Sequence, residues 1–223
     1  MRTEFCTLGT ENYMISLENV TFSYPKANEA IIRAVSADFR TGECVAVTGH
    51  NGCGKTTLIQ LICGVLRPAS GHILINGNDT SVLSLFEIGQ QIGCVFQDPA
   101  RQLFCETVEE EIRFGLEAMG LPETEIRSRT EKYLAVFRLE HRRNAFPGLL
   151  SQGEKQRTIL AAVLSMGTEF VVLDEPTSGL DMEGRKELGT LLRGLTADGH
   201  GVIFVSHERA FIDTYATREW VIR

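Results

Sequence analysis

One glycine-rich loop constrains the fold of this chain more than any other feature. Residues 49–56 read GHNGCGKT and fit the pattern G-x-x-x-x-G-K-[ST]. The apolar run 44–48 before the loop predicts a short buried strand. After the loop, apolar residues recur on one helix face at Leu58, Leu61, Ile62 and Val65. A strand, a glycine-rich turn and a helix in this order predict an α/β fold.

The loop has the chemistry of a phosphate-binding site. Glycines let the backbone curl so that successive N–H groups face inward, and these donors bind phosphate oxygens together with the following helix start. Lys55 is placed to reach the β- and γ-phosphates of a nucleotide, and Thr56 to offer its hydroxyl to Mg²⁺. The expected nucleotide-binding residues of this segment are Gly49, His50, Asn51, Gly52, Cys53, Gly54, Lys55, Thr56 and Thr57. Alone, the loop leaves kinases, GTPases and many ATPases open.

Two acidic residues follow a second apolar run. Residues 170–173 predict a strand that ends in Asp174 and Glu175. An acid at the carboxyl end of a strand can hold Mg²⁺ through water, and a second acid beside it can polarise an attacking water. A pair of solvated turn acids is the alternative, and the phosphate loop in the same chain argues against it.

The remainder of the chain alternates strand and helix signals. Further strands are expected at 15–20, 31–39, 73–75, 92–96 and 202–205. Residues 106–146 have a charged, helical pattern, with Pro122 placed to start a helix. Residues 1–13 lack periodicity and are interpreted as a leader. This alternation predicts a mostly parallel sheet with helices on both faces.

Composition limits the classes of function. The chain has 223 residues, 43% of them hydrophobic, which suits one globular domain. No run approaches the roughly 20 apolar residues that span a bilayer, so a membrane role requires a partner. The formal net charge of −7 disfavours nucleic acid as a partner, because phosphate backbones bind basic surfaces. Six cysteines without a C-x-x-C pair or zinc spacing predict reduced thiols.

A third segment links these motifs to a family. Residues 150–154 read LSQGE, precede a predicted helix, and stand upstream of the LDEP run 173–176. This order resembles the ATP-binding cassette (ABC) family, whose signature usually reads LSGGQ. The resemblance covers the chain from Ile15 to Arg223.

The resemblance implies a single nucleotide-binding domain, 1–223, with three parts. A P-loop NTPase core with a small antiparallel β subdomain is expected at 14–98 and 165–223. A helical subdomain that carries the signature is expected at 99–164.

The resemblance also implies roles for individual residues. Tyr24 matches the aromatic residue that stacks on adenine, and His207 matches the histidine near the γ-phosphate. Gln97 matches the glutamine that touches Mg²⁺ and relays contact with a membrane subunit. The implied catalytic residues are Glu175, His207, Lys55 and Gln97, and the implied magnesium ligands are Thr56, Gln97 and Asp174. Simple packing for Tyr24 and a surface-loop position for Gln97 stay open as alternatives.

In this family two cassettes close around ATP, and each signature contacts the nucleotide on the other copy's phosphate loop. The residues implied to act there are Ser151, Gly153, Glu154 and Asp181. A helix start suits an anion because its N–H groups lack partners. Two departures affect this half-site: Gln152 replaces a glycine, and Glu154 replaces a glutamine and, when ionised, cannot donate a hydrogen bond. N-capping of the next helix is a further role open to Asp181.

Two segments indicate a subgroup. Residues 96–104 (FQDPARQLF) and 107–115 (TVEEEIRFG) resemble the ATPases of energy-coupling factor transporters, the vitamin and cobalt/nickel importers. This resemblance implies an ATPase at the cytoplasmic face of the cell membrane that powers solute uptake. Its implied partners are an identical or different second ATPase, a transmembrane coupling subunit and a solute-binding membrane subunit.

In that subgroup the stretch 97–115 faces the transmembrane partner. Leu103 and Phe104 are adjacent apolar residues in a predicted loop and form a candidate anchor for a partner helix. Packing of both beneath the helical subdomain is the alternative. Residues 109–111 are three glutamates, and a solvated helix face is the simplest interpretation of them.

Other members of the family remain as alternatives. They are another ABC importer or exporter, a soluble cassette of DNA repair or chromosome maintenance, a translation-associated cassette, and a nucleotide sensor that does not hydrolyse. The short stretch between Gln97 and Ser151 argues against the DNA-repair type, whose catalytic halves are separated by a long coiled coil. Glu175 argues against a sensor, and a steady-state ATPase assay distinguishes that alternative.

Overall fold

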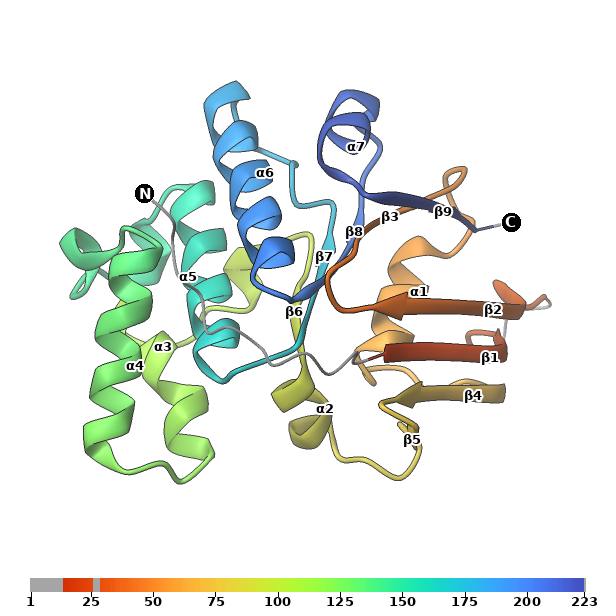
Figure 1. The fold of residues 1–223 in the computed structure, drawn as a ribbon, viewed down its shortest axis with the longest axis horizontal. Coiled ribbons are helices and arrows are strands. Elements are labelled where there is room, and N and C mark those ends of the chain that lie inside the picture. The colour runs from red at the N-terminus through yellow and green to blue at the C-terminus, as the bar shows by residue number, and fades with distance from the viewer. Residues whose placement is uncertain (1–13, 26–28, 223) are drawn as a thin grey trace.

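Two β-sheets form the centre of the structure, a computed structural model that describes residues 14–25 and 29–222 (Figure 1). The antiparallel sheet has the order β2 (Ile32–Arg40), β1 (Met14–Phe22), β4 (Ser70–Ile75) and β5 (Asn78–Asp79). The parallel sheet has the order β6 (Ile92–Val95), β7 (Phe170–Asp174), β8 (Gly201–Val205), β3 (Cys44–Thr48) and β9 (Arg218–Val221). The expected leader, 1–13, lies outside the described residues.

The helices that cover these sheets differ in length. The longer ones are α1 (Lys55–Ile62), α3 (Val108–Ala118), α4 (Glu123–Val136), α5 (Gln152–Ser165) and α6 (Met182–Ala197). The shorter ones are α2 (Leu85–Gln91), α7 (Arg209–Tyr215) and the 3₁₀ turns η1 (Pro99–Arg101), η2 (Glu140–Arg142) and η3 (Pro147–Leu149). In Figure 1, α3, α4 and α5 lie on the left, and α1 lies on the right with the antiparallel sheet. Within the described ranges, no helix is both long and apolar enough to cross a membrane.

Alternate residues of the parallel strands face two different cores. Val45 and Val47 of β3 belong to one cluster, which includes Leu58 of α1 and the antiparallel sheet. Ala46 belongs to the other, which includes Leu160 of α5 and leucines of α6. Burial on both sides explains why these strands are continuous apolar runs in the sequence. The predicted α/β class, with a parallel sheet, a small antiparallel sheet and covering helices, is confirmed.

The register of three parallel strands positions the loops that follow them. Val205, the last residue of β8, is level with both Val47 of β3 and Asp174 of β7. The chain therefore leaves all three strands at the same edge of the sheet. The segments that meet there are residues 49–56, Glu175 and His207.

The helix after the phosphate loop is shorter than the apolar pattern predicts. It ends at Ile62, and Gly64 adopts a φ of 72°, a left-handed conformation typical of helix ends. Val65 therefore lies outside the helix and is 52% exposed, so its predicted place on the apolar face is wrong.

Periodicity does not predict α2, α7 and β9, because each is too short for a repeated apolar face. A different signal marks α2. Ser84 Oγ accepts a hydrogen bond from the Glu87 N–H at 3.2 Å, and the Glu87 carboxylate accepts one from the Ser84 N–H at 2.8 Å. This reciprocal cap has the sequence pattern S-x-x-E, which is recognisable without a structure.

One pair of cysteines differs from the expectation of reduced thiols. A disulfide joins Cys63 at the end of α1 to Cys94 in β6, with Cα atoms 6.7 Å apart. The two residues are 31 positions apart in sequence and come together because α1 and β6 pack in the same core, a contact that spacing rules do not reveal. Cys44, Cys53 and Cys105 are free thiols.

The core supports a stability prediction at Phe204. Its ring is fully buried in β8 and meets Phe211 edge-on at 5.6 Å. We expect Phe204→Ala to lower the free energy of unfolding by about 3–5 kcal/mol, because the substitution leaves a cavity. Urea unfolding measures the change, with Val82→Ala as a control at a side chain that is 79% exposed. Similar small losses for both variants would contradict the placement of Phe204.

Candidate active site

Residues 49–56 connect β3 to α1, and glycines set the path of this loop. Gly49, Gly52 and Gly54 have φ angles of 152°, 81° and 97°. A Cβ on Gly49 would lie 2.7 Å from Cys53 Sγ, so this position requires glycine. The loop curls at the start of α1, where free backbone N–H groups suit an anion.

Lys55 is the first residue of α1, and its ammonium group bends back over the loop. Its Nζ donates to the carbonyl oxygens of Gly49 at 3.0 Å and His50 at 3.1 Å. The Cys53 N–H donates to the same His50 carbonyl at 3.3 Å. Lys55 is buried, so its charge is concentrated where nucleotide phosphates are expected.

The end of β7 provides oxygen ligands for a cation. Asp174 is 2% exposed, and its carboxylate lies near the Thr56 hydroxyl. Burial raises the pKa of Asp174, while the nearby Thr56 hydroxyl and the Lys55 charge oppose this shift. The buried Oδ1 of Asp174 has no hydrogen-bond partner among the described residues. A cation would satisfy that orphaned oxygen.

Mg²⁺ fits this donor set. It prefers oxygen ligands and usually binds through one or two protein groups, with water and phosphate at its other positions. Asp174 and Thr56 supply a carboxylate and a hydroxyl side by side. Within the described part of the chain, no group of three or more His, Cys, Asp or Glu side chains could hold a metal alone. A magnesium ion held by Asp174 and Thr56 would take its other ligands from water or a bound phosphate.

Glu175 and His207 form a pair at the same edge. His207 Nε2 lies 3.0 Å from Glu175 Oε1. Glu175 has a φ of 48°, which costs a non-glycine residue about 1–3 kcal/mol, and its N–H donates to the Val205 carbonyl at 3.0 Å. Burial raises the pKa of Glu175, and His207 opposes this shift. A carboxylate with a raised pKa is the better proton acceptor.

A narrow cleft joins Gln97 to the two acids. Its lining includes Gln97, Asp174, Glu175, Gln152 and Ser178. Gln97 is exposed and follows β6, the neighbour of β7 in the sheet. The structure thus gathers the expected magnesium ligands and the expected catalytic residues at one edge of the parallel sheet.

Tyr24 lies beside the first turn of α1. Its hydroxyl is 3.2 Å from Thr57 Oγ1 and 3.4 Å from Gln60 Oε1, and its ring meets Phe22 at 5.0 Å. The residue is 41% exposed. Contacts at its edge and hydroxyl fix the ring next to the phosphate loop, and its stacking on a base stays a prediction.

The signature residues lie apart from the phosphate loop of the same chain. Figure 1 shows α5 and α1 on opposite sides of β7 and β8. Ser151 is the N-cap of α5, and its Oγ accepts from the Glu154 N–H at 3.3 Å. The Cγ of Gln152 lies 3.5 Å from the position that a Cβ on Gly179 would take, so this side chain is directed at the loop before α6.

Asp181 is the N-cap of α6. Its Oδ1 accepts a hydrogen bond from the Gly184 N–H at 2.7 Å, so its capping role is confirmed. Its contact with a second copy stays a prediction.

Three contacts involve residues whose structural roles the sequence analysis does not predict. Arg142 Nε donates to Glu154 Oε1 at 2.8 Å. Gln156 Nε2 donates to the Pro176 carbonyl at 3.0 Å and ties α5 to the turn after β7. Glu111 is buried and accepts hydrogen bonds from two backbone N–H groups of the loop after η1. Each of these residues either contacts a segment distant in sequence or stands outside any recognisable motif.

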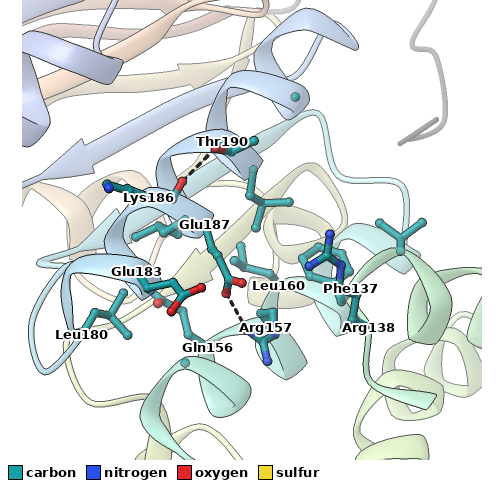
Figure 2. Close-up of a pocket in the computed structure, with 16 residues that line it drawn as sticks. Phe137, Arg138, Gln156, Arg157, Leu160, Leu180, Glu183, Lys186, Glu187 and Thr190 are labelled. Atoms are coloured by element: carbon teal, nitrogen blue, oxygen red, sulfur yellow. Dashed lines mark hydrogen bonds and ion pairs between the residues drawn. The ribbon is translucent and has the colours of Figure 1, made fainter. Parts of the chain in front are cut away.

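A separate cavity of about 430 Å³ lies between α5 and α6 (Figure 2). Leu160 and Phe137 contribute to its apolar lining, and an ion pair of 3.2 Å joins Arg157 to Glu187 beside it. No residue of the phosphate loop lines this cavity. Volume alone therefore does not mark the nucleotide site.

Comparisons with known proteins agree with this site. The profile of the family described as ABC transporter matches residues 32–178. The structure superposes on CbiO1 from Clostridium perfringens, described as part of the ABC transporter complex cbiONQ, with a TM-score of 0.85 and 33% identity. That match covers 96% of this chain and 86% of CbiO1. The chain belongs to the ABC transporter family, and it is an ABC ATPase with a P-loop NTPase core.

Its relatives include the expected subgroup. The energy-coupling factor transporter ATP-binding protein EcfA of Methanothermobacter thermautotrophicus is 40% identical over 94% of this chain and 68% of EcfA. The cobalt import ATP-binding protein CbiO of Syntrophus aciditrophicus is 38% identical over 87% of this chain and 70% of CbiO. A putative ABC transporter ATP-binding protein of Methanosarcina mazei is 36% identical over 96% of this chain but only 42% of its own length. The predicted resemblance to energy-coupling factor ATPases is confirmed.

The phosphate loop supports a binding prediction. We expect Lys55→Ala to weaken the binding of a fluorescent ATP analogue by about 100-fold, because a buried charge among the phosphate positions is lost. Equilibrium titration measures the dissociation constant. Lys132→Ala, on the exposed surface of α4, is the matched control and should bind as the parent does. Equal binding by the parent and Lys55→Ala would contradict the location of the site.

Proposed function

We propose that this chain hydrolyses Mg²⁺-bound ATP as one of two cassettes that close around the nucleotide and power transport through a membrane partner. The observation that carries the proposal is the arrangement at the edge of the parallel sheet. There, the Lys55 ammonium, the unpartnered Asp174 oxygen and the Glu175–His207 pair surround the end of one anion-binding loop.

On this proposal, different residues of the chain have separate roles in hydrolysis. Lys55 and the loop amides bind the phosphates and stabilise the charge that develops on them. Glu175 orients the attacking water and accepts its proton, while His207 orients the Glu175 carboxylate and lies next to the γ-phosphate. Asp174, Thr56 and Gln97 would hold Mg²⁺, which would neutralise phosphate charge when bound.

The signature requires a second cassette. Gln152 at the start of α5 lines the cleft beside Glu175, but α5 lies across β7 and β8 from α1 (Figure 1). On this proposal Ser151 and Gly153 therefore do not bind the nucleotide on the phosphate loop of their own chain. A two-fold pair lets each chain present this helix start, with Asp181 nearby, to ATP on its partner. The partner cassette is a second copy of this chain or a related ATPase. Loss of the γ-phosphate by hydrolysis removes a shared ligand and lets the pair reopen.

Similarity to EcfA and CbiO favours solute uptake of the energy-coupling factor type, for a vitamin or a transition-metal ion. On this proposal the chain acts at the cytoplasmic face of the membrane with a transmembrane coupling subunit and a solute-binding membrane subunit. Another ABC importer or an exporter is the alternative, because the ATPase chemistry is the same for both.

An exposed aromatic surface supports docking of a transmembrane subunit. Phe104 is 67% exposed and meets Phe114, also exposed, edge-on at 4.8 Å. Phe146 and Leu149 are exposed as well, and a cavity of about 290 Å³ lies between the loop of Phe104 and the segment that precedes the signature. Apolar surface beside a cavity suits an apolar helix of a partner. Burial of Phe104 beneath the helices is therefore wrong, whereas Leu103 packs against the core.

Glu111 fixes the shape of this surface. It is 6% exposed, and its Oε1 accepts from the N–H groups of Phe104 at 2.5 Å and Cys105 at 2.6 Å. The expectation of a solvated glutamate face at 109–111 is wrong at this residue, because the preceding loop folds over the start of α3. We further propose that 99–164 moves as one helical subdomain against the core, 14–98 and 165–223, so that a shift at Gln97 reaches this surface.

Removal of the Glu175 carboxylate tests the catalytic assignment. We expect Glu175→Gln to bind ATP like the parent, to hydrolyse it at least about 100-fold more slowly, and to accumulate as an ATP-dependent dimer. Sedimentation velocity and a steady-state ATPase assay measure the two effects, and removal of Mg²⁺ with EDTA should abolish hydrolysis by the parent. Glu183→Gln, an exposed acid in α6, is the control. Normal turnover by Glu175→Gln would contradict its role.

The docking surface is tested by Phe104→Asp. Because this side chain is mostly exposed, we expect a folded protein with near-parental ATPase activity in solution but loss of assembly with the membrane subunits. Co-purification from membranes measures assembly, and Val82→Asp, at an exposed site in another part of the chain, is the control. A Phe104→Asp protein that still assembles and supports transport would refute the docking role.

A further inference from the structure

The signature of this chain carries a negative charge in the first turn of α5. Glu154 is the third residue of α5 and is 8% exposed. Burial opposes its ionisation, but hydrogen bonds from Ser151 and Arg142 lower the pKa of Glu154 to about 2. The carboxylate is therefore ionised at neutral pH. A negative charge in the first turn offsets the positive end of the helix dipole, which weakens attraction for a second anion.

Arg142 holds this carboxylate from the preceding turn η2. Its Nε donates to Glu154 Oε1 at 2.8 Å, and the guanidinium remains about half exposed. His141 Nε2 lies 3.8 Å from the same oxygen. The other carboxylate oxygen, Oε2, accepts from the Ser151 N–H at 2.8 Å. Both oxygens of Glu154 are thus engaged within the chain, which argues against its implied contact with the nucleotide.

The geometry points to Arg142 as a positioning residue that neutralises Glu154 and keeps the start of α5 able to bind a phosphate anion. This inference rests on the proposed function, in which that anion is the γ-phosphate of ATP on the partner cassette. Because the Ser151 Oγ accepts from the Glu154 N–H, its own hydroxyl proton stays available for the phosphate. Arg142 also keeps the Glu154 carboxylate turned toward the Ser151 N–H and away from the incoming nucleotide.

A double-mutant cycle tests the inference in the full chain with Glu175→Gln as the background, so that ATP persists. Sedimentation gives the dissociation constant of the ATP-dependent dimer for Arg142→Ala, Glu154→Gln and the two together. We expect Arg142→Ala to weaken the dimer by about tenfold or more, since each of two symmetric sites gains an uncompensated charge. Glu154→Gln should stay within about threefold of the background, and adding Arg142→Ala to it should change little.

Further variants separate charge compensation from a structural role. Arg142→Lys should restore most of the dimer affinity, and Arg127→Ala, an exposed arginine of α4, should leave it unchanged. ATP binding to the dilute monomer should be the same for every variant, because that site uses the phosphate loop. An equal loss from Arg142→Ala in the presence and absence of the Glu154 carboxylate would overturn the inference. A background protein that never pairs with ATP would overturn the proposed pairing and this inference with it.

Discussion

The level alignment of Val205 with Val47 and Asp174 is the constraint on which the rest of the site depends. It brings the ends of three strands to one edge, so that the phosphate loop, Glu175 and His207 meet. A slip of one residue would turn Asp174 to the opposite face of the sheet and separate it from Thr56. Complete burial of β7 and β8 on both faces holds this register, because a slip would repack both cores.

Local chemistry explains which parts could be predicted from the sequence. The loop 49–56 and the acids at the end of β7 are recognisable in the sequence, because phosphate and metal binding require glycine, lysine and carboxylate residues at such positions. The strand order cannot be predicted from the sequence, because β8 lies between β3 and β7 in the sheet although it comes last of the three in the chain. For that reason only the family resemblance implies that Glu175 and His207 belong to one site.

The residues that sequence reasoning missed act through tertiary contacts. Glu111 stands in a run of three glutamates, and nothing within that run distinguishes it from the half-buried Glu109 and the exposed Glu110. Arg142 belongs to a short turn without a motif, yet it contacts the signature carboxylate. Glu111 holds the loop of Phe104 at the proposed docking surface, and Arg142 holds the carboxylate in the signature. The cavity beside Phe104 is also lined by Phe146 and Lys155, so a partner bound there touches the segments on either side of Ser151.

The central claim is that each nucleotide site is completed by a second chain, and complementation between two inactive proteins tests it most directly. Lys55→Ala lacks a working phosphate loop, and Gly153→Asp places a carboxylate at the start of α5, where an added Cβ meets only Leu180 at 3.7 Å. Each protein alone should be inactive. An equal mixture should recover roughly a quarter of the parental ATPase activity, because half of the pairs carry one intact composite site of two. A mixture that stays as inactive as its components would contradict the account.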